Sequence, residues 1–308
     1  MVSSAPEAAG ADGEGLIGQL ERGRRQFLAL VEPVRPELHR YCARMTGSIA
    51  DGEDVVQDTL AAAYYELSQM KAMPALRPWL FRIAHNRAID HWRRERVRAS
   101  EPLDAAADVP DDSAHEPEQA LVRQQAVRAA ISAFLALPAT QRACVILKDV
   151  LGHSLEEIAS ELGLGVPAVK AALHRGRAAL ALAASASSDA VATVSPALQR
   201  YASLFNARDW DGVRALLADD VRLDLVSRRR LAGPEVGTYF SNYHGVAGWR
   251  LLPARLDGHE VIAVQLAAGD AQPAYLIVLG WRDGRVRTIR DYRYVPYIAR
   301  EAAFRFVG

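Results

Sequence analysis

The segment "WLFRIAHNRAIDHWRR", residues 79–94, combines tryptophans with many arginines in a chain of zero net charge, which raises the question of what the chain binds. At about 100° per residue its apolar side chains gather on one face of a helix. The opposite face carries Arg82, Asn86, Asp90 and Arg93. Guanidiniums pair with phosphates and an amide can bond a base edge, so this face suits nucleic acid. A solvated amphipathic helix would show the same pattern, and the segment alone leaves both interpretations open.

Length, charge and cysteine content limit the kinds of protein that this chain can be. The 308 residues predict two or three domains, and a hydrophobic content of 50% is enough for real cores. Lys+Arg and Asp+Glu both total 37, so the net charge indicates no polyanionic partner. Cys42 and Cys144 lie in apolar, helix-patterned contexts without metal or disulfide spacing, and we expect them to be buried in a reducing compartment. We expect no cofactor and no metal.

The termini and linkers are recognised by composition. Residues 1–22 are rich in Ala, Gly and acids, and we expect a disordered leader rather than a signal peptide. Residues 99–118 carry seven acidic residues, three prolines and no Lys or Arg, which is typical of an extended acidic linker. Residues 184–195 read as a second, small-residue linker. No apolar run approaches membrane-spanning length, so we expect a cytoplasmic protein without a membrane partner.

The first block, residues 23–98, contains a second helical segment before the arginine-rich one. Residues 51–67, "DGEDVVQDTLAAAYYEL", have apolar side chains at helical spacing and Asp51 as the expected N-cap. Asp54, Gln57 and Asp58 fall together on its polar side, a strip suited to a basic protein partner. A solvated helix face is the alternative.

Together these two segments resemble region 2 of bacterial RNA polymerase sigma factors of the extracytoplasmic-function (ECF) group. The family pattern runs roughly D-A-E-D-(V/L)-(V/T)-Q-(D/E), then W-L-(Y/F)-R-I-A-(R/H)-N, and Gly52 departs from its usual Ala. The resemblance implies a helical bundle that docks onto core polymerase and opens the minus-ten promoter element. It implies core contacts by Asp54, Gln57 and Asp58. It implies minus-ten contacts by Arg82, Asn86, Asp90, Arg93 and Arg94, with Asn86 and Asp90 on the base-contacting stretch.

The second block, residues 119–183, reads as a helix-turn-helix. Ser154 and Glu157 form an expected capping box, Gly163 ends that helix, and Pro167 lies in the first turn of the next. The segment "HSLEEIASELGLGVPAVKAALHRGRAAL" resembles sigma region 4, which binds the minus-thirty-five element. By that match the DNA-facing residues are Lys170, Ala171, His174, Arg175 and Arg177. Ala168 and Ala171 replace hydroxyls common in the family, and His174 and Arg175 could contact phosphate alone.

The third block, residues 196–308, changes to helices followed by alternating strands. This order predicts an α+β cone with an antiparallel sheet. "YASLFNARDWDGVRALLADDV" resembles the opening of SnoaL-like domains, which some ECF sigma factors carry at the C-terminus. The fold usually encloses a pocket, and each pocket candidate has a structural or rim position as its alternative. The candidates are Asp224, Tyr239, His244, Asp291 and Tyr292.

The sequence therefore predicts a multidomain chain of two all-α sigma domains and one α+β SnoaL-like domain. The expected function is that of a transcription initiation subunit without catalytic activity, modulated by its third block. The expected partners are core RNA polymerase and promoter DNA, with a small-molecule ligand as a candidate for the third block. Whether a separate anti-sigma factor exists stays open. The alternatives are a cyclase- or isomerase-type enzyme fused to a helix-turn-helix regulator, and a repressor that acts without polymerase.

Overall fold

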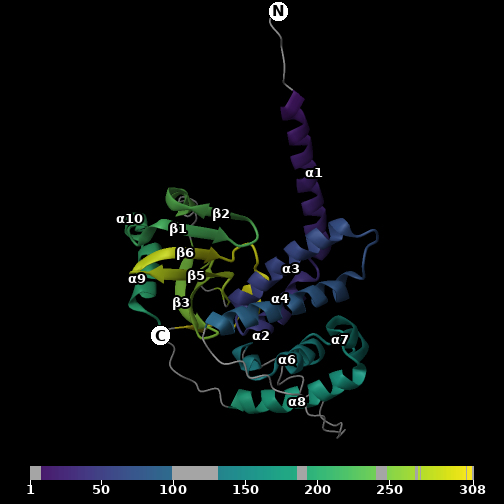
Figure 1. Cartoon of the computed structure of the whole chain (residues 1–308). Helices are drawn as coiled ribbons and strands as arrows, with labels where there is room; N and C mark the ends of the chain where they lie inside the picture. The colour runs from purple at the N-terminus through teal and green to yellow at the C-terminus, as the bar shows by residue number, and fades with distance from the viewer. Residues whose placement is uncertain are drawn as a thin grey trace, which may run out of the picture.

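The computed structural model describes residues 8–98, 131–185, 193–240, 248–267, 270, 272–302 and 304–306. Helices form the first and second blocks, and helices followed by a sheet form the third, as the sequence predicts (Figure 1). The acidic linker at 99–118 and the pocket candidate His244 lie outside the described residues.

The first block consists of helices α1 (Ala8–Val31), α2 (Arg35–Thr46), α3 (Ile49–Gln69) and α4 (Leu76–Arg98). Gly47 ends α2 in the left-handed conformation, with φ of 78°, and Ser48 then begins α3 as its N-cap. The Ser48 hydroxyl accepts from the backbone N–H of Asp51. The prediction that Asp51 itself is the N-cap is therefore wrong, because Ser48 is an equally good acceptor and follows directly on the turn-forming glycine.

The N-terminal helix is longer than the sequence predicts. Residues 8–22, expected in a disordered leader, lie in α1, which projects from the body of the molecule (Figure 1). The base of α1 is anchored because Phe27 and Val31 are buried, and the Phe27 and Tyr64 rings lie 5.3 Å apart. Gly10, Gly13, Gly15 and Gly18 lower the helix propensity of this extension, so composition argued against a helix here. The helix continues from its anchored base because propagating a helix costs less than nucleating one.

The second block begins in the described chain with the 3-10 helix η1 (Ile131–Ala136). Its further elements are α6 (Ala139–Val145), η2 (Ile146–Val150), α7 (Leu155–Leu162) and α8 (Val166–Ser185). The predicted capping box is confirmed, since Ser154 and Glu157 each bond the other's backbone N–H. Gly163 ends α7 with φ of 67°, also as predicted. The turn between α7 and α8 is thus encoded locally.

The first and second blocks share one hydrophobic core. Arg142 of α6 is 1% exposed and donates to the carbonyl of Met45 at 2.5 Å and to that of Leu137 at 2.9 Å. Its guanidinium also lies over the Trp92 ring, 5.9 Å from the centroid. Burial lowers the pKa of Arg142 to about 10. A buried guanidinium held this way ties the second block to the end of α2 and to α4.

The third block opens with α9 (Pro196–Asn206) and α10 (Trp210–Ala215), which pack on one face of a seven-stranded sheet. The sheet order is β2-β1-β6-β5-β4-β3-β7. The strands are β1 (Leu217–Leu225), β2 (Arg229–Ala232), β3 (Arg250–Leu256), β4 (His259–Gln265), β5 (Tyr275–Arg282), β6 (Arg285–Asp291) and β7 (Arg305–Phe306). The short helices are η3 (Gly233–Glu235), α11 (Val236–Tyr239) and α12 (Tyr297–Glu301).

Two features of this sheet differ from the sequence prediction. Strands β1 and β6 pair in parallel, with Leu223 opposite Ile289, so the sheet is mixed rather than antiparallel. The short edge strands β2 and β7 were not predicted. A parallel pair needs a long crossover, here from residue 225 to 285, and such non-local pairing leaves no local sequence pattern.

Candidate functional site

The outward face of α4 is exposed. Its predicted minus-ten residues Arg82, Asn86, Asp90, Arg93 and Arg94 all carry solvent-exposed side chains. The Arg93 guanidinium lies 4.0 Å from the Asp90 carboxylate, and Arg94 Nε donates to the Asp90 carbonyl at 3.3 Å. The opposite face, with Phe81, Ala84 and Ala88, is buried. In this arrangement α4 thus presents amide, carboxylate and guanidinium groups to an incoming ligand.

A buried contact that the sequence analysis missed holds α4 against α2. The Tyr41 hydroxyl and His85 Nδ1 lie 2.7 Å apart, and Tyr41 packs edge-on against Phe81. Burial lowers the pKa of His85, which favours its neutral imidazole. At the start of α4, Arg77 donates to both carboxylate oxygens of Glu37 at 3.0 and 3.1 Å. These contacts fix the orientation of the exposed face.

The acidic strip on α3 is partly covered by the third block. Asp58 is exposed and Gln57 is half-buried, whereas the Asp54 carboxylate accepts from both terminal nitrogens of Arg290 on β6. One of these bonds measures 2.9 Å. Burial raises the pKa of Asp54, and the Arg290 charge opposes that rise. Of the three predicted polymerase contacts, one is therefore engaged within the chain.

Further contacts join the third block to the start of α2 and α3. Glu53 is fully buried, accepts from Arg35 at 2.5 Å and accepts from the Tyr297 hydroxyl at 2.6 Å. Burial and the Glu53 charge raise the pKa of Tyr297. Arg35 also donates to the Ser227 hydroxyl in the β1–β2 turn. Glu53 matches the third position of the region 2 pattern, but the pattern gave it no role, because a carboxylate at a helical position usually indicates a solvated face.

Apolar side chains complete this interface on the outer face of the sheet. Ile49 of α3 and Ala43 of α2 belong to one buried cluster with residues of β3, β4, β5 and the chain after β6. The members contributed by the third block are Val226, Ala254, Leu256, Val261, Leu276, Tyr292, Val295 and Ile298. The third block thus covers the N-terminal part of α3, and the remainder of the helix extends away from it (Figure 1).

The recognition helix α8 divides its predicted DNA residues into two groups. Lys170 and His174 are exposed, and Ala171 and Arg175 are half-buried. Arg177 instead donates to both oxygens of the buried Asp149, at 2.7 and 2.9 Å. This bidentate pair holds α8 against η2, so Arg177 has a structural contact whether or not it also meets DNA.

The pocket candidates of the third block do not converge. Asp291 is fully buried, accepts from the Tyr239 hydroxyl and accepts from the backbone N–H of Arg293 at 2.8 Å. Tyr292, the next residue, packs in the outer-face cluster against α2 and α3. Asp224 is a half-buried residue between buried neighbours on β1 and lies 3.6 Å from Arg230. Adjacent strand residues face opposite sides of a sheet, so only Tyr239 and Asp291 among the described candidates form a pair.

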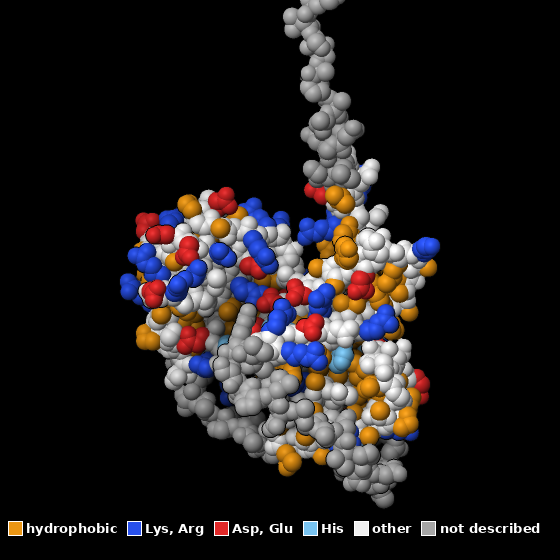
Figure 2. Space-filling model, viewed as in Figure 1, with side chains coloured by type: hydrophobic (Ala, Val, Ile, Leu, Met, Phe, Trp, Pro, Cys, Tyr) orange, Lys and Arg blue, Asp and Glu red, His pale blue; other side chains and the backbone are white. Residues whose placement is uncertain are grey.

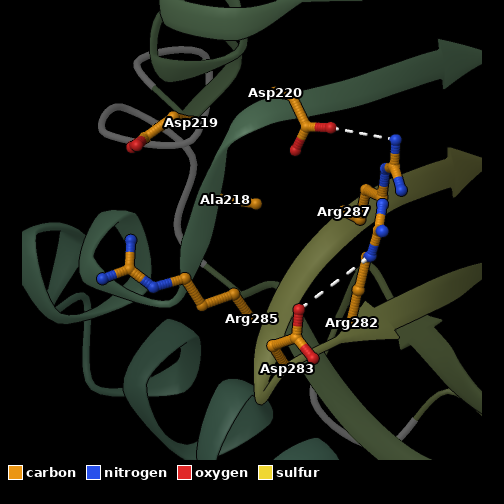
Figure 3. A pocket seen from close by; sticks show the side chains of 7 residues that line it. All are labelled: Ala218, Asp219, Asp220, Arg282, Asp283, Arg285 and Arg287. Carbon is orange, nitrogen blue, oxygen red and sulfur yellow. Dashed lines mark ion pairs between the residues drawn. The ribbon is translucent and has the colours of Figure 1, made fainter.

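A charged hollow lies elsewhere on the third block (Figure 3). It is formed by the start of β1 and the β5–β6 turn. Its lining residues are Ala218, Asp219, Asp220, Arg282, Asp283, Arg285 and Arg287. Arg287 pairs with Asp220 at 3.0 Å and Arg282 with Asp283 at 3.9 Å, so its charges largely compensate one another. In the view of Figure 2, positive and negative side chains intermingle over this block.

Comparison with known proteins identifies the two helical blocks. Residues 30–98 match the model of Sigma-70 region 2, and residues 128–180 match that of Sigma-70, region 4. The chain is 35% identical to the ECF RNA polymerase sigma factor SigF of Caulobacter vibrioides, over 46% of this chain and 75% of that protein. It is 30% identical to SigW of Bacillus subtilis, over 53% of this chain and 92% of that protein.

The chain belongs to the ECF sigma factors. The sigma factor is also 34% identical to SigG of Mycobacterium tuberculosis, but the match spans 61% of this chain and 58% of that protein. Among solved structures, it is similar to M. tuberculosis SigJ, with 19% identity, 86% and 95% coverage and a TM-score of 0.35. Its third block is similar to a ketosteroid isomerase-like protein of Kribbella flavida, with 29% identity, 31% and 73% coverage and a TM-score of 0.26.

In the described part of this sigma factor, none of the helices combines the length and apolarity that crossing a bilayer requires. The same residues hold no group of three or more His, Cys, Asp or Glu side chains that could bind a metal ion. Cys42 and Cys144 are free and buried, as predicted from their apolar contexts.

Proposed function

We propose that this chain binds core RNA polymerase, directs it to promoters and helps to open the minus-ten element. The observation that carries the proposal is that each of the two matched regions presents an exposed polar helix face. On α4 that face includes Asn86 and Asp90, and on α8 it includes Lys170 and His174. RNA synthesis itself would be carried out by the polymerase core.

The distance between promoter elements implies that the first and second blocks separate when the chain works. Minus-ten and minus-thirty-five elements lie about 25 base pairs apart, or about 85 Å at 3.4 Å per base pair. Here α7 packs on α4, and the rings of Phe81 and His153 are 5.0 Å apart. The 29 residues between the two matched regions, 99 to 127, could span at most about 100 Å when extended, which is enough to bridge the elements. We infer that the compact arrangement is a resting state.

We further propose that the third block holds the chain in this resting state. Arg290 occupies the carboxylate of Asp54, one of the residues expected to meet polymerase. A tethered domain has a local concentration on the order of millimolar, so a weak contact of this kind is well populated. The third block then competes with polymerase for the Asp54 carboxylate. Removing the chain from Ser195 onward should therefore change promoter-dependent transcription several-fold.

The expected small-molecule ligand of the third block gains no support from the described pocket candidates, because Tyr239 and Asp291 are buried and bonded to each other. Such a ligand could shift the equilibrium between the docked and the released third block only if it bound one of these two states better than the other. An enzymatic role would need a reacting group with access to substrate, and Asp291 is fully buried. The sigma function is therefore the one proposed.

Co-elution with core polymerase tests the proposal against a repressor that acts alone. The purified chain is mixed with core polymerase and passed over a sizing column, and the complex is then tested for promoter binding. The proposal predicts a stoichiometric complex that gains sequence-specific DNA binding. A chain that binds promoter DNA equally well without polymerase, and does not co-elute with it, would be a repressor.

A further inference from the structure

The β3–β4 turn of the third block has a defined and simple geometry. Asp257 and Gly258 form a two-residue hairpin closed by the pair Leu256 and His259. Both turn residues have positive φ, 51° at Asp257 and 81° at Gly258, which is the type I′ geometry. Asp-Gly is among the preferred sequences for this turn, so the turn itself explains the residue types. The turn does not explain which group the Asp257 carboxylate contacts.

That carboxylate reaches across to the first block. Asp257 Oδ2 accepts from the backbone N–H of Ile49, the first helical residue of α3, at 3.0 Å. Ser48, the N-cap of α3, accepts from Asp51 and not from Ile49 in the described bonds. The first N–H groups of a helix have no partner within it, and Ile49 is fully buried. The amino terminus of α3 is therefore capped in two parts, one of them supplied by a different domain.

The electrostatic setting supports the same contact. A negative charge at a helix amino terminus is favourable, because the helix dipole is positive there. Burial raises the pKa of Asp257, whereas the hydrogen bond from Ile49 and the nearby charges of His259 and Arg44 oppose that rise. Ile49 and Leu256 belong to one buried cluster, and the half-buried Asp257 carboxylate reaches the Ile49 N–H from the edge of that cluster.

We propose that Asp257 is a positioning residue for α3, so that the third block forms a structural part of the polymerase-docking surface as well as a cover over it. Its carboxylate holds the first turn of the helix that carries Asp54, Gln57 and Asp58. The third block then has two separable effects. The Arg290 contact keeps Asp54 from polymerase, and the Asp257 contact stabilises the first turn of the helix on which Asp54 lies. The functional half of this inference rests on the proposed docking of α3 onto polymerase.

Two substitutions in the full-length chain separate the carboxylate from the turn. D257G keeps the positive-φ turn and removes the acceptor, whereas D257N keeps both the turn and an oxygen acceptor. The chain also offers a matched control, D283G. Asp283 and Gly284 form the corresponding turn between β5 and β6, with φ of 51° and 75°. The Asp283 side chain is exposed and lies 3.9 Å from Arg282 of its own block.

Two measurements are made on the four proteins. Hydrogen–deuterium exchange is followed at the amides of Ile49 to Gly52, and affinity for core polymerase is measured in parallel. We expect D257G to exchange at least tenfold faster at Ile49 and to bind core several-fold more weakly. D283G should match the unmodified chain, and D257N should lie close to it.

Each other outcome overturns a defined part of the inference. Unchanged exchange in D257G overturns the cap itself. Faster exchange with unchanged core affinity overturns the positioning role and leaves the proposed function intact. If D257G and D283G show the same increase in exchange and the same loss of core affinity, the effect comes from the turns and not from the Asp257 carboxylate. If all four proteins fail to bind core, the proposed function is overturned together with the positioning role, and the exchange data still decide the cap.

Discussion

Arg290 on β6 and Asp54 on α3, 236 residues apart in sequence, form a two-bond ion pair between the third block and the first. The arginine side chain is 23% exposed and the carboxylate 43%. Arg290 also lies over the ring of Tyr292, 5.4 Å from its centroid. The pair links the sheet of the third block to the helix proposed to dock onto polymerase.

The first prediction follows from this pair. Arg290→Gln should raise the affinity for core polymerase about threefold to tenfold, because a partly exposed ion pair contributes about 1 kcal/mol to the docked state. Binding to labelled core polymerase measures the change. Arg287→Gln is the control, since Arg287 lies on the same strand and pairs with Asp220 inside the third block. Unchanged or weaker binding by the Arg290 variant would show that the pair does not restrain the chain.

The second prediction concerns strand opening. Asn86→Ala should reduce open-complex formation about fivefold or more, because an amide that bonds a base edge contributes about 1–3 kcal/mol. Core binding should be unaffected, since Asn86 is exposed on α4 and not on α3. Permanganate reactivity of the minus-ten thymines reports opening, and Ser68→Ala on the exposed side of α3 is the control. Normal reactivity with the Asn86 variant contradicts the assignment.

The third prediction separates structural from DNA-binding residues on α8. Arg177→Ala leaves the buried Asp149 carboxylate without its bidentate partner and should destabilise the second block by about 1–3 kcal/mol. Lys170→Ala should leave stability unchanged and weaken promoter binding, because Lys170 is exposed. Urea unfolding and DNA titrations are compared for both variants. Equal stability of the two would mean that the Arg177–Asp149 pair contributes nothing.

The fourth prediction concerns pH. Burial lowers the pKa of His85 below its ordinary value of 6.5, so the unfolded chain binds this proton more readily than the folded one. The stability that depends on neutral His85 is complete above pH 6.5 and is lost as the pH falls below it. His85→Gln should flatten the decline of the midpoint of thermal unfolding between pH 7.5 and about 5.5. If the midpoint of the His85 variant falls as steeply as that of the unmodified chain, a group other than His85 causes the pH dependence.

Local chemistry made much of this fold predictable from sequence. The Ser154–Glu157 capping box and the Gly163 helix end are encoded within a few residues, and the apolar period of α4 correctly separates its buried face from its exposed one. The N-cap of α3 was misassigned by three residues because Ser48 and Asp51 are both good N-caps. Local rules locate such a helix but do not choose between neighbouring acceptors.

Contacts between distant segments were beyond prediction. Asp54 was predicted to be a docking residue, yet nothing near it in sequence indicates Arg290 as its partner. Asp257 appears in the sequence as an ordinary Asp-Gly turn, and its bond to Ile49 depends on how the third block packs against α3. The same is true of buried Glu53, whose charge is tolerated because Arg35 and Tyr297 surround it.

Run-off transcription shows whether this sigma factor directs core polymerase to promoters. Core polymerase is incubated with and without the chain on genomic fragments enriched by the complex of the two. We expect discrete transcripts that require the chain and are lost when Asn86 and Lys170 are both replaced by Ala. Transcripts that are the same with and without the chain, or that survive the double substitution, would contradict it.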